Sequence, residues 1–168
     1  MHSESIDSRA GPSATAIELP EPAATDAFGR RLAQVLARWK QGLVVSLIGD
    51  LGAGKTALMR AILGALGEPG PVVSPSYTLV EPYTVAGRNV YHVDLYRLAD
   101  PAELDYLGLR DINPATDWLF AEWADKGGSG LPPIDIKICL EYVGCARRAT
   151  VDAMSERGAD FWAGFEHP

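Results

Sequence analysis

The sequence holds few of the residues that build metal centres and disulfide frameworks. It has two cysteines and three histidines among 168 residues. Cys139 and Cys145 are close together in the sequence, and no second cysteine pair completes a metal-ligand spacing. This pattern excludes the common cysteine–histidine metal sites, and we expect both cysteines to be buried, reduced thiols.

Long apolar runs are also missing. No stretch approaches the roughly 20 apolar residues that a membrane-spanning helix needs. Residues 1–13 lack the apolar core of a signal peptide. We therefore expect a cytosolic protein with no membrane contact.

Positive charge is scarce. Lysine and arginine number 15 against 22 aspartate and glutamate residues, so the formal net charge is -7. Affinity for a nucleic-acid backbone comes from clustered lysine and arginine. A broad basic face is therefore excluded, and we expect any role with tRNA to be indirect or shared with a partner protein.

The length and the apolar content of 47% suit one domain with one sizeable core. Residues 1–21 mix Ser, Ala, Pro and Glu without apolar periodicity, which predicts a flexible leader. We place the domain at residues 22–156. Residues 157–168 form a C-terminal tail that matches no motif, and we expect the function to survive removal of the leader and the tail.

Apolar periodicity inside the domain predicts alternating helices and strands. A helix is expected from Thr25, as its cap, to Gly42, with further helices over residues 56–66 and 101–107. Strands are expected over residues 43–48, 77–85, 89–95, 118–121, 134–142 and 148–153. The turn Ala86-Gly87-Arg88 joins two of these strands into a β-hairpin.

A phosphate-binding loop lies between the second predicted helix and the strand before it. The run reads Gly49, Asp50, Leu51, Gly52, Ala53, Gly54, Lys55 and Thr56. Its glycines allow backbone N–H groups to approach phosphate oxygens, Lys55 reaches the terminal phosphates, and the Thr56 hydroxyl contacts magnesium. The order of elements then predicts a single-domain α/β P-loop NTPase fold with a central, mostly parallel sheet. ATP is preferred over GTP because no Asn-Lys-x-Asp segment follows.

Magnesium in such a site needs an acidic group at the end of a neighbouring strand. Glu122 ends the apolar run 118–121, the usual setting of a metal carboxylate. Asp94 shares an alternating polar face with His92 and Tyr96. From the residues alone, Asp94 is a water-positioning carboxylate or part of a polar network on the hairpin, and His92 is a hydrogen-bonding residue of the strand.

Five other positions are candidates for a functional role, and each also has a simpler structural explanation. Thr78 is the best candidate for a hydroxyl that senses the terminal phosphate, within the Ser74–Thr78 segment, although a threonine in a strand needs no function. Trp123 stacks on the nucleotide or a partner, or packs in the core. Arg97 remains a candidate for supplying positive charge to phosphate or to a partner, and surface roles are expected for Arg147 and Arg148.

Four ordered motifs carry a family resemblance: Gly49–Thr56, Ser74–Glu81, His92–Leu98 and Glu122-Trp123. Together they resemble the bacterial TsaE (YjeE) family over nearly the whole domain. The resemblance implies a weak ATPase that joins TsaB and TsaD, which transfer a threonylcarbamoyl group to an adenosine of tRNA. It also implies magnesium on Glu122, a functional Asp94 and a site-lining Trp123.

Two other functions fit parts of the sequence. A small-molecule kinase would carry the same loop, but we find no helical lid with an arginine between Asn89 and Glu122. A nucleotide-dependent binding module, in which ATP orders residues 74–78 for a partner, would have the same sequence as the ATPase.

Overall fold

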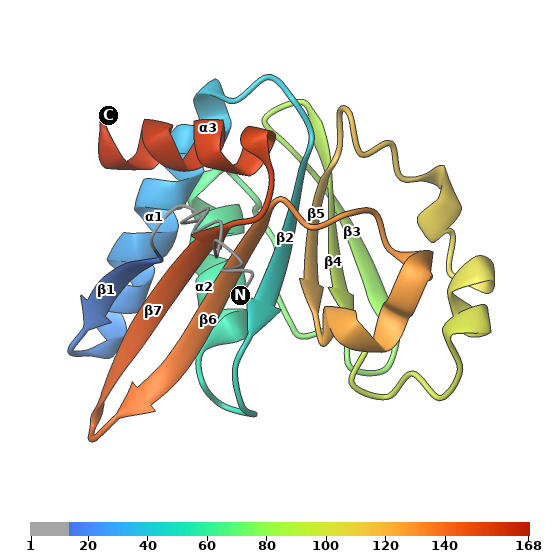
Figure 1. Cartoon of the computed structure of the whole chain (residues 1–168), viewed down its shortest axis with the longest axis horizontal. Coiled ribbons are helices and arrows are strands. Elements are labelled where there is room, and N and C mark those ends of the chain that lie inside the picture. The colour runs from blue at the N-terminus through green and yellow to red at the C-terminus, as the bar shows by residue number, and fades with distance from the viewer. Residues whose placement is uncertain (1–13) are drawn as a thin grey trace, which may run out of the picture.

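The computed structural model describes residues 14–168, which form one seven-stranded sheet with helices beside it (Figure 1). The elements in chain order are β1 (Thr15–Leu19), α1 (Pro22–Arg38), β2 (Leu43–Ile48), α2 (Lys55–Ala65), β3 (Val80–Val85), β4 (Arg88–Asp94), η1 (Pro101–Tyr106), η2 (Leu109–Asp111), β5 (Trp118–Glu122), η3 (Ala124–Gly130), β6 (Ile136–Val143), β7 (Ala146–Ala153) and α3 (Glu156–Glu166).

The strands lie in the order β1-β7-β6-β2-β5-β4-β3. The four central strands, β6, β2, β5 and β4, are parallel, and the strands outside them pair antiparallel. The predicted α/β fold and the β3–β4 hairpin are confirmed, and the sheet is mixed. Because parallel strands share their direction, the ends of β2, β4 and β5 meet at one edge of the sheet.

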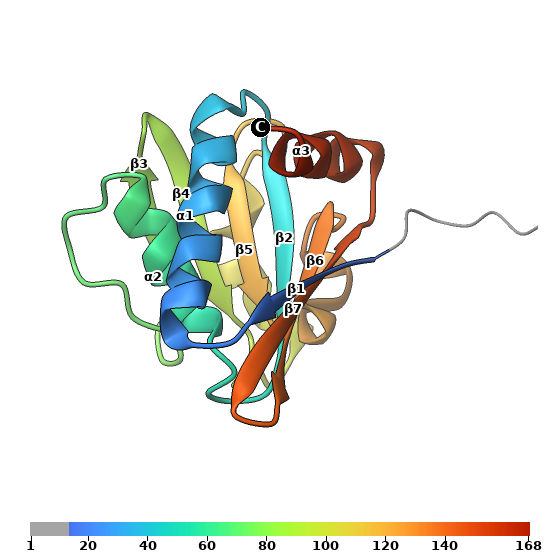
Figure 2. The same cartoon turned by 90° about the vertical axis from the view of Figure 1, so that its left-hand side faces the viewer.

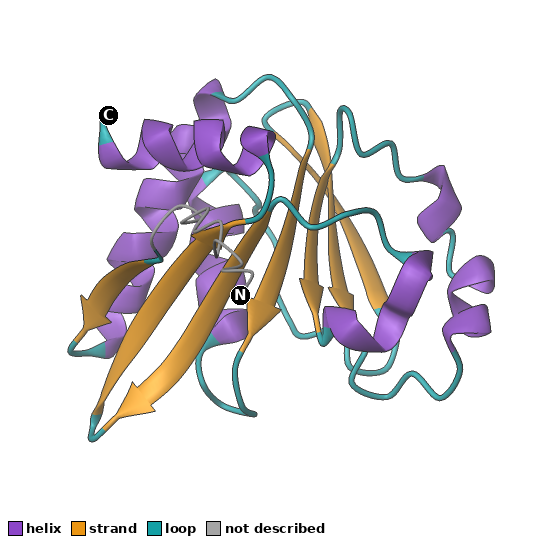
Figure 3. Cartoon of the chain, viewed as in Figure 1, coloured by secondary structure: helices purple, strands orange, loops and turns teal. Residues whose placement is uncertain are grey.

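The two faces of the sheet are covered differently. Side chains alternate along β2, so Leu43, Val45 and Leu47 pack in a core with α1, α2 and α3, whereas Val44 belongs to a second core. The second core includes residues of η1 and η2 and their neighbours. Figure 2 shows α1 and α2 together over one face, and Figure 3 shows the three short helical turns gathered beside β3–β5.

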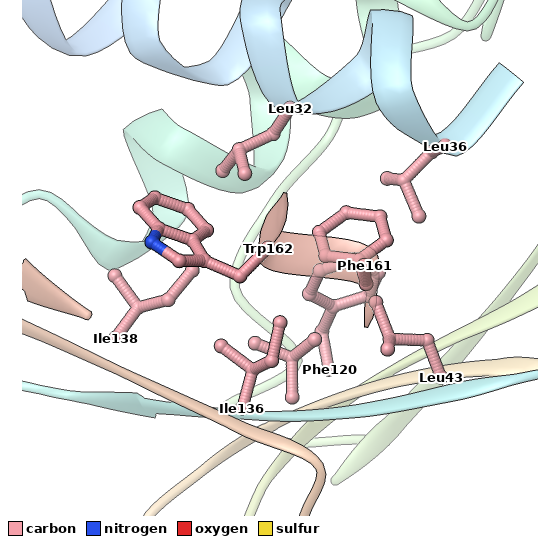
Figure 4. Close-up of a pocket in the computed structure, with 9 residues that line it drawn as sticks. Leu32, Leu36, Leu43, Phe120, Ile136, Ile138, Phe161 and Trp162 are labelled. Atoms are coloured by element: carbon pink, nitrogen blue, oxygen red, sulfur yellow. The ribbon is translucent and has the colours of Figure 1, made fainter. Parts of the chain in front are cut away.

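The C-terminal segment, expected to be a dispensable tail, is the helix α3. Its Phe161, Trp162 and Phe165 are buried. Figure 4 shows Phe161 and Trp162 between Leu32 and Leu36 of α1 and four side chains of the sheet, Leu43, Phe120, Ile136 and Ile138. The cavity left among these residues is about 10 Å³, so the core depends on α3 to be filled.

The start of the chain also differs from the expectation. Within the expected leader, Thr15–Leu19 is an edge strand that pairs antiparallel with β7, and Leu19 is buried. The expectation of flexibility was therefore wrong for this strand, while residues 1–13 lie outside the described residues. The first long helix begins at Pro22 and not after Thr25, because proline suits the first helical turn.

The cysteines are less buried than expected. Cys145 is exposed in the β6–β7 turn and Cys139 is half-buried, and both are free. Burial is the main reason that the pKa of the Cys139 thiol is raised. No helix among residues 14–168 is long and apolar enough to cross a membrane.

Candidate functional site

The phosphate loop connects the carboxyl end of β2 to the amino end of α2. Gly54 precedes α2 with a left-handed φ of 113°. A Cβ at Gly49 would lie 2.6 Å from the Leu140 carbonyl oxygen, so no larger residue fits there. Because α2 begins at Lys55, the N–H groups of its first turn have no carbonyl partner within the helix. The loop therefore presents donors and a positive helix end toward an anion.

Lys55 is buried and turned onto its own loop. Its Nζ donates to the Gly49 carbonyl at 2.5 Å and to the Asp50 carbonyl at 3.1 Å, and it lies 3.8 Å from Oε2 of Glu122. A phosphate would compete for an ammonium group that already has three oxygen neighbours.

Asp94 and Glu122 lie opposite each other at the ends of the parallel strands β4 and β5, and both are buried. Oδ2 of Asp94 accepts from the Ser74 hydroxyl at 3.0 Å, and Oδ1 accepts from the backbone N–H of Tyr96 at 3.0 Å. Two carboxylates and one ammonium thus meet beside the loop. The two acids named from the sequence belong to one site.

His92 reaches the same site from β4. The side chain is fully buried, and its Nε2 lies 2.9 Å from Oε1 of Glu122. Its predicted role as a hydrogen-bonding residue of the strand is confirmed. The Glu122 carboxylate therefore has the imidazole on one oxygen and the Lys55 ammonium near the other.

The segment Ser74–Thr78 touches the site through its first residue. The Thr78 hydroxyl is exposed and donates to Glu81 at 2.9 Å. Ser74 contacts Asp94, and the Ser76 hydroxyl donates to Ser74 at 3.2 Å. In this structure Ser74, and not Thr78, is the hydroxyl brought to the carboxylates.

Trp123 follows Glu122 and is half-buried, with a left-handed φ of 55°. Its ring lies 5.1 Å from the Tyr96 ring, centroid to centroid, and Nζ of Lys55 lies 5.7 Å from its ring centroid. The indole therefore borders both the phosphate loop and the segment after β4. This position agrees with a site-lining side chain.

Two residues near the β6–β7 turn contact the loop; the sequence had not singled out Tyr142 and had assigned Arg147 to the surface. Tyr142 donates from its hydroxyl to the Gly52 carbonyl at 2.6 Å, and Nη2 of Arg147 donates to the same oxygen at 3.4 Å. The Arg147 guanidinium lies 5.3 Å from the Tyr142 ring centroid. No local motif marks them, since only the register of β6 against β7 brings this pair to the loop.

The residues present fit a magnesium–nucleotide complex. Thr56 follows Lys55 in α2, and Glu122 lies beside Lys55, so two oxygen donors border one loop. Among residues 14–168 no three histidine, cysteine or acidic side chains gather to hold a cation by themselves. Magnesium in nucleotide sites takes one or two protein oxygens and completes its shell with phosphate and water oxygens, so this donor set suits it.

Known proteins resemble the chain over most of its length. The family model described as "Threonylcarbamoyl adenosine biosynthesis protein TsaE" matches residues 19–150. A tRNA threonylcarbamoyladenosine biosynthesis protein TsaE of Haemophilus influenzae is 42% identical over 142 residues, covering 83% of this chain and 90% of the relative. The protein of the same name from Bacillus subtilis is 34% identical over 119 residues, covering 70% of this chain and 74% of the relative. The crystal structure of Bacillus subtilis YdiB superposes with a TM-score of 0.71 at 25% identity, covering 93% of this chain and 97% of that one.

Proposed function

Because this chain belongs to the TsaE family of threonylcarbamoyl adenosine biosynthesis proteins, we propose that it binds Mg-ATP and hydrolyses it in support of that tRNA modification. The observation that carries the proposal is the meeting of Lys55, Asp94 and Glu122 beside the glycine loop. A charged triphosphate needs both a cradle of N–H groups and a metal carboxylate, and the two lie together here.

The loop from Asp50 to Thr56 holds the phosphates through its N–H groups and the start of α2. Lys55 leaves the carbonyls of Gly49 and Asp50 for the terminal phosphates, because a charge-assisted bond to phosphate is stronger than a bond to a neutral carbonyl. Arg147, which donates to the Gly52 carbonyl, adds a second cation beside the loop. Trp123 lines the site beside Lys55.

Thr56 and Glu122 hold the magnesium ion, and His92 orients the Glu122 carboxylate. When bound, magnesium neutralises charge on the phosphate oxygens and fixes their geometry. Asp94 positions the attacking water. A carboxylate accepts about four hydrogen bonds, so its bonds from Ser74 and Tyr96 leave acceptor capacity for that water.

The hydrolysis is slow in the isolated chain and is stimulated by the partner proteins TsaB and TsaD. Among residues 14–168, Arg147 is the arginine whose guanidinium reaches the phosphate loop, and it donates to a loop carbonyl. Arg97 lies over the ring of Tyr77, 4.5 Å from its centroid. A fast phosphoryl-transfer site has a freely placed arginine, so partners supply groups or geometry. The chain contacts tRNA only indirectly.

A second candidate function is a nucleotide-dependent binding module in which hydrolysis is incidental. The Ser74–Asp94 hydrogen bond favours it, because this bond connects the segment 74–78 to the phosphate site. Nucleotide would then order that segment for a partner.

Phosphate release by the purified chain, with and without TsaB and TsaD, tests the proposal. We expect slow release that rises with the partners and is lost in Lys55→Ala, together with modification of tRNA that requires ATP. Modification that continues with a non-hydrolysable ATP analogue would favour the binding module. Calorimetry that finds full Mg-ATP affinity in Lys55→Ala would contradict the phosphate site itself.

A further inference from the structure

A large groove opens on the sheet face opposite α2 and ends at the phosphate loop. Its lining includes Ile48, Asp125, Leu131, Lys137, Cys139 and Glu141, and we call it the β2–β6 groove. The floor consists of side chains of β2 and β6 that alternate away from the helix-covered core. The wall is the segment from Trp123 through η3 to Ile134. Gly49 and Asp50 of the loop close one end.

The groove is larger than most small-molecule sites and is partly apolar. Its volume is about 1230 Å³, above the roughly 300–1,000 Å³ of small-molecule sites. Ile48 is 42% exposed there, and Leu131, Pro132 and Pro133 form an apolar part of the wall. A peptide segment with an apolar side chain matches this shape.

The negative charge of the groove favours a positively charged occupant. Three acidic residues, Asp50, Asp125 and Glu141, line it against one lysine, Lys137. The pKa of Cys139, within the groove, is raised by burial and then by Glu141, Asp152 and Asp50, which agrees with a negative local field. Such a field repels the phosphates of a nucleic acid and attracts lysine or arginine.

We propose that the β2–β6 groove is the docking surface for a positively charged, partly apolar segment of a partner protein. The inference rests on the partner-dependent activity proposed above and adds the place of contact. Because Asp50 belongs both to the groove and to the phosphate loop, a segment seated there touches the loop directly. Its basic side chains meet Asp125 and Glu141, and its apolar side chain covers Ile48.

Binding of the full chain to purified TsaB and TsaD tests the surface by calorimetry. Asp125→Lys combined with Glu141→Lys is expected to weaken binding about tenfold or more, and rising salt is expected to weaken binding of the unsubstituted chain. Asp160→Lys, exposed on α3, is the control for net charge and is expected to change affinity less than about twofold. Both variants should bind Mg-ATP as the unsubstituted chain does.

Alkylation of Cys139 by iodoacetamide supplies a local readout, with Cys145 outside the groove lining as the reference. We expect the partners to slow Cys139 alkylation about fivefold or more and Cys145 alkylation much less. Normal binding by the doubly substituted chain, or an unprotected Cys139 in the complex, overturns the groove and leaves the proposed function standing. No binding by the unsubstituted chain overturns the partner assignment together with the groove. Protection of Cys139 by tRNA alone would show a nucleic-acid surface and would also overturn the proposal.

Discussion

His92 and Glu122 form a hydrogen bond of 2.9 Å between neighbouring parallel strands, and both side chains are buried. The other ring nitrogen of His92, Nδ1, has no partner within residues 14–168. Within the described residues, the imidazole therefore makes its hydrogen bond to the carboxylate proposed to hold magnesium. A carboxylate fixed in this way is already oriented when the ion arrives.

Replacing His92 by Leu is expected to weaken magnesium-dependent ATP binding about tenfold, because loss of a residue that orients a metal ligand costs about 10–100-fold in affinity. His92→Gln keeps an N–H donor and is expected to lose less. Calorimetric titrations with and without chelator measure the effect, and circular dichroism checks the fold. Equal affinities for all three proteins would show that the hydrogen bond is only structural.

Glu122→Ala and Asp94→Ala are expected to impair different steps, nucleotide binding and hydrolysis respectively. Glu122→Ala should reduce ATP affinity only when magnesium is present, because the lost group contacts the metal. Asp94→Ala should bind nucleotide nearly as well as the unsubstituted chain and hydrolyse it more slowly. Nucleotide titrations and phosphate release separate the two effects. If Asp94→Ala shows the magnesium-dependent loss instead, the two roles are exchanged.

Arg147→Ala is expected to lower ATP affinity about tenfold, since a hydrogen bond to a charged group contributes about 1.5–3 kcal/mol. The adjacent Arg148→Ala is a matched control. Arg148 points to the other face of β7 and pairs with Glu18 at 2.7 Å, with both side chains partly exposed. Its removal should leave affinity unchanged. Parallel ATP titrations of the two variants measure the difference, and similar losses of affinity in both would contradict a specific role for Arg147.

Local sequence patterns were sufficient to predict the phosphate loop but not all the residues that contact it. The run from Gly49 to Thr56 is contiguous, so its spacing alone identifies the phosphate site. Arg147 reaches Gly52 only through the pairing of β6 with β7, which no nearby residue signals. Ser74 lies within the segment singled out from the sequence, yet its contact with Asp94 depends on how the chain folds between them.

Local sequence patterns also gave limited information about the first strand and the last helix of the domain. The strand Thr15–Leu19 has few residues and pairs with β7 more than a hundred residues later, so its own sequence carries little signal. The helix α3 was more readable, because Ser155 caps it and Phe161 and Phe165 recur at helical spacing. Lack of a family motif there led us to expect a dispensable tail.

Phe161→Ala is expected to destabilise the fold by about 3–5 kcal/mol, because it empties space between α1 and the sheet. Urea unfolding followed by tryptophan fluorescence measures the change. The neighbouring Asp160→Ala is the control, since Asp160 is exposed and its loss should change the free energy of unfolding by less than about 0.5 kcal/mol. A Phe161→Ala chain as stable as this control would mean that α3 is dispensable after all.

The contact between β1 and α3 affects the order in which the elements of the fold assemble. The Thr15 hydroxyl donates to Glu166 at 3.0 Å, and the Trp162 indole donates to Thr15 at 3.1 Å. The strand β1 therefore makes these hydrogen bonds only with a helix that follows it by 147 to 151 residues. Closing so long a loop is entropically costly. The phosphate loop and its neighbouring strands can therefore assemble before the edge made by β1, β7 and α3 closes.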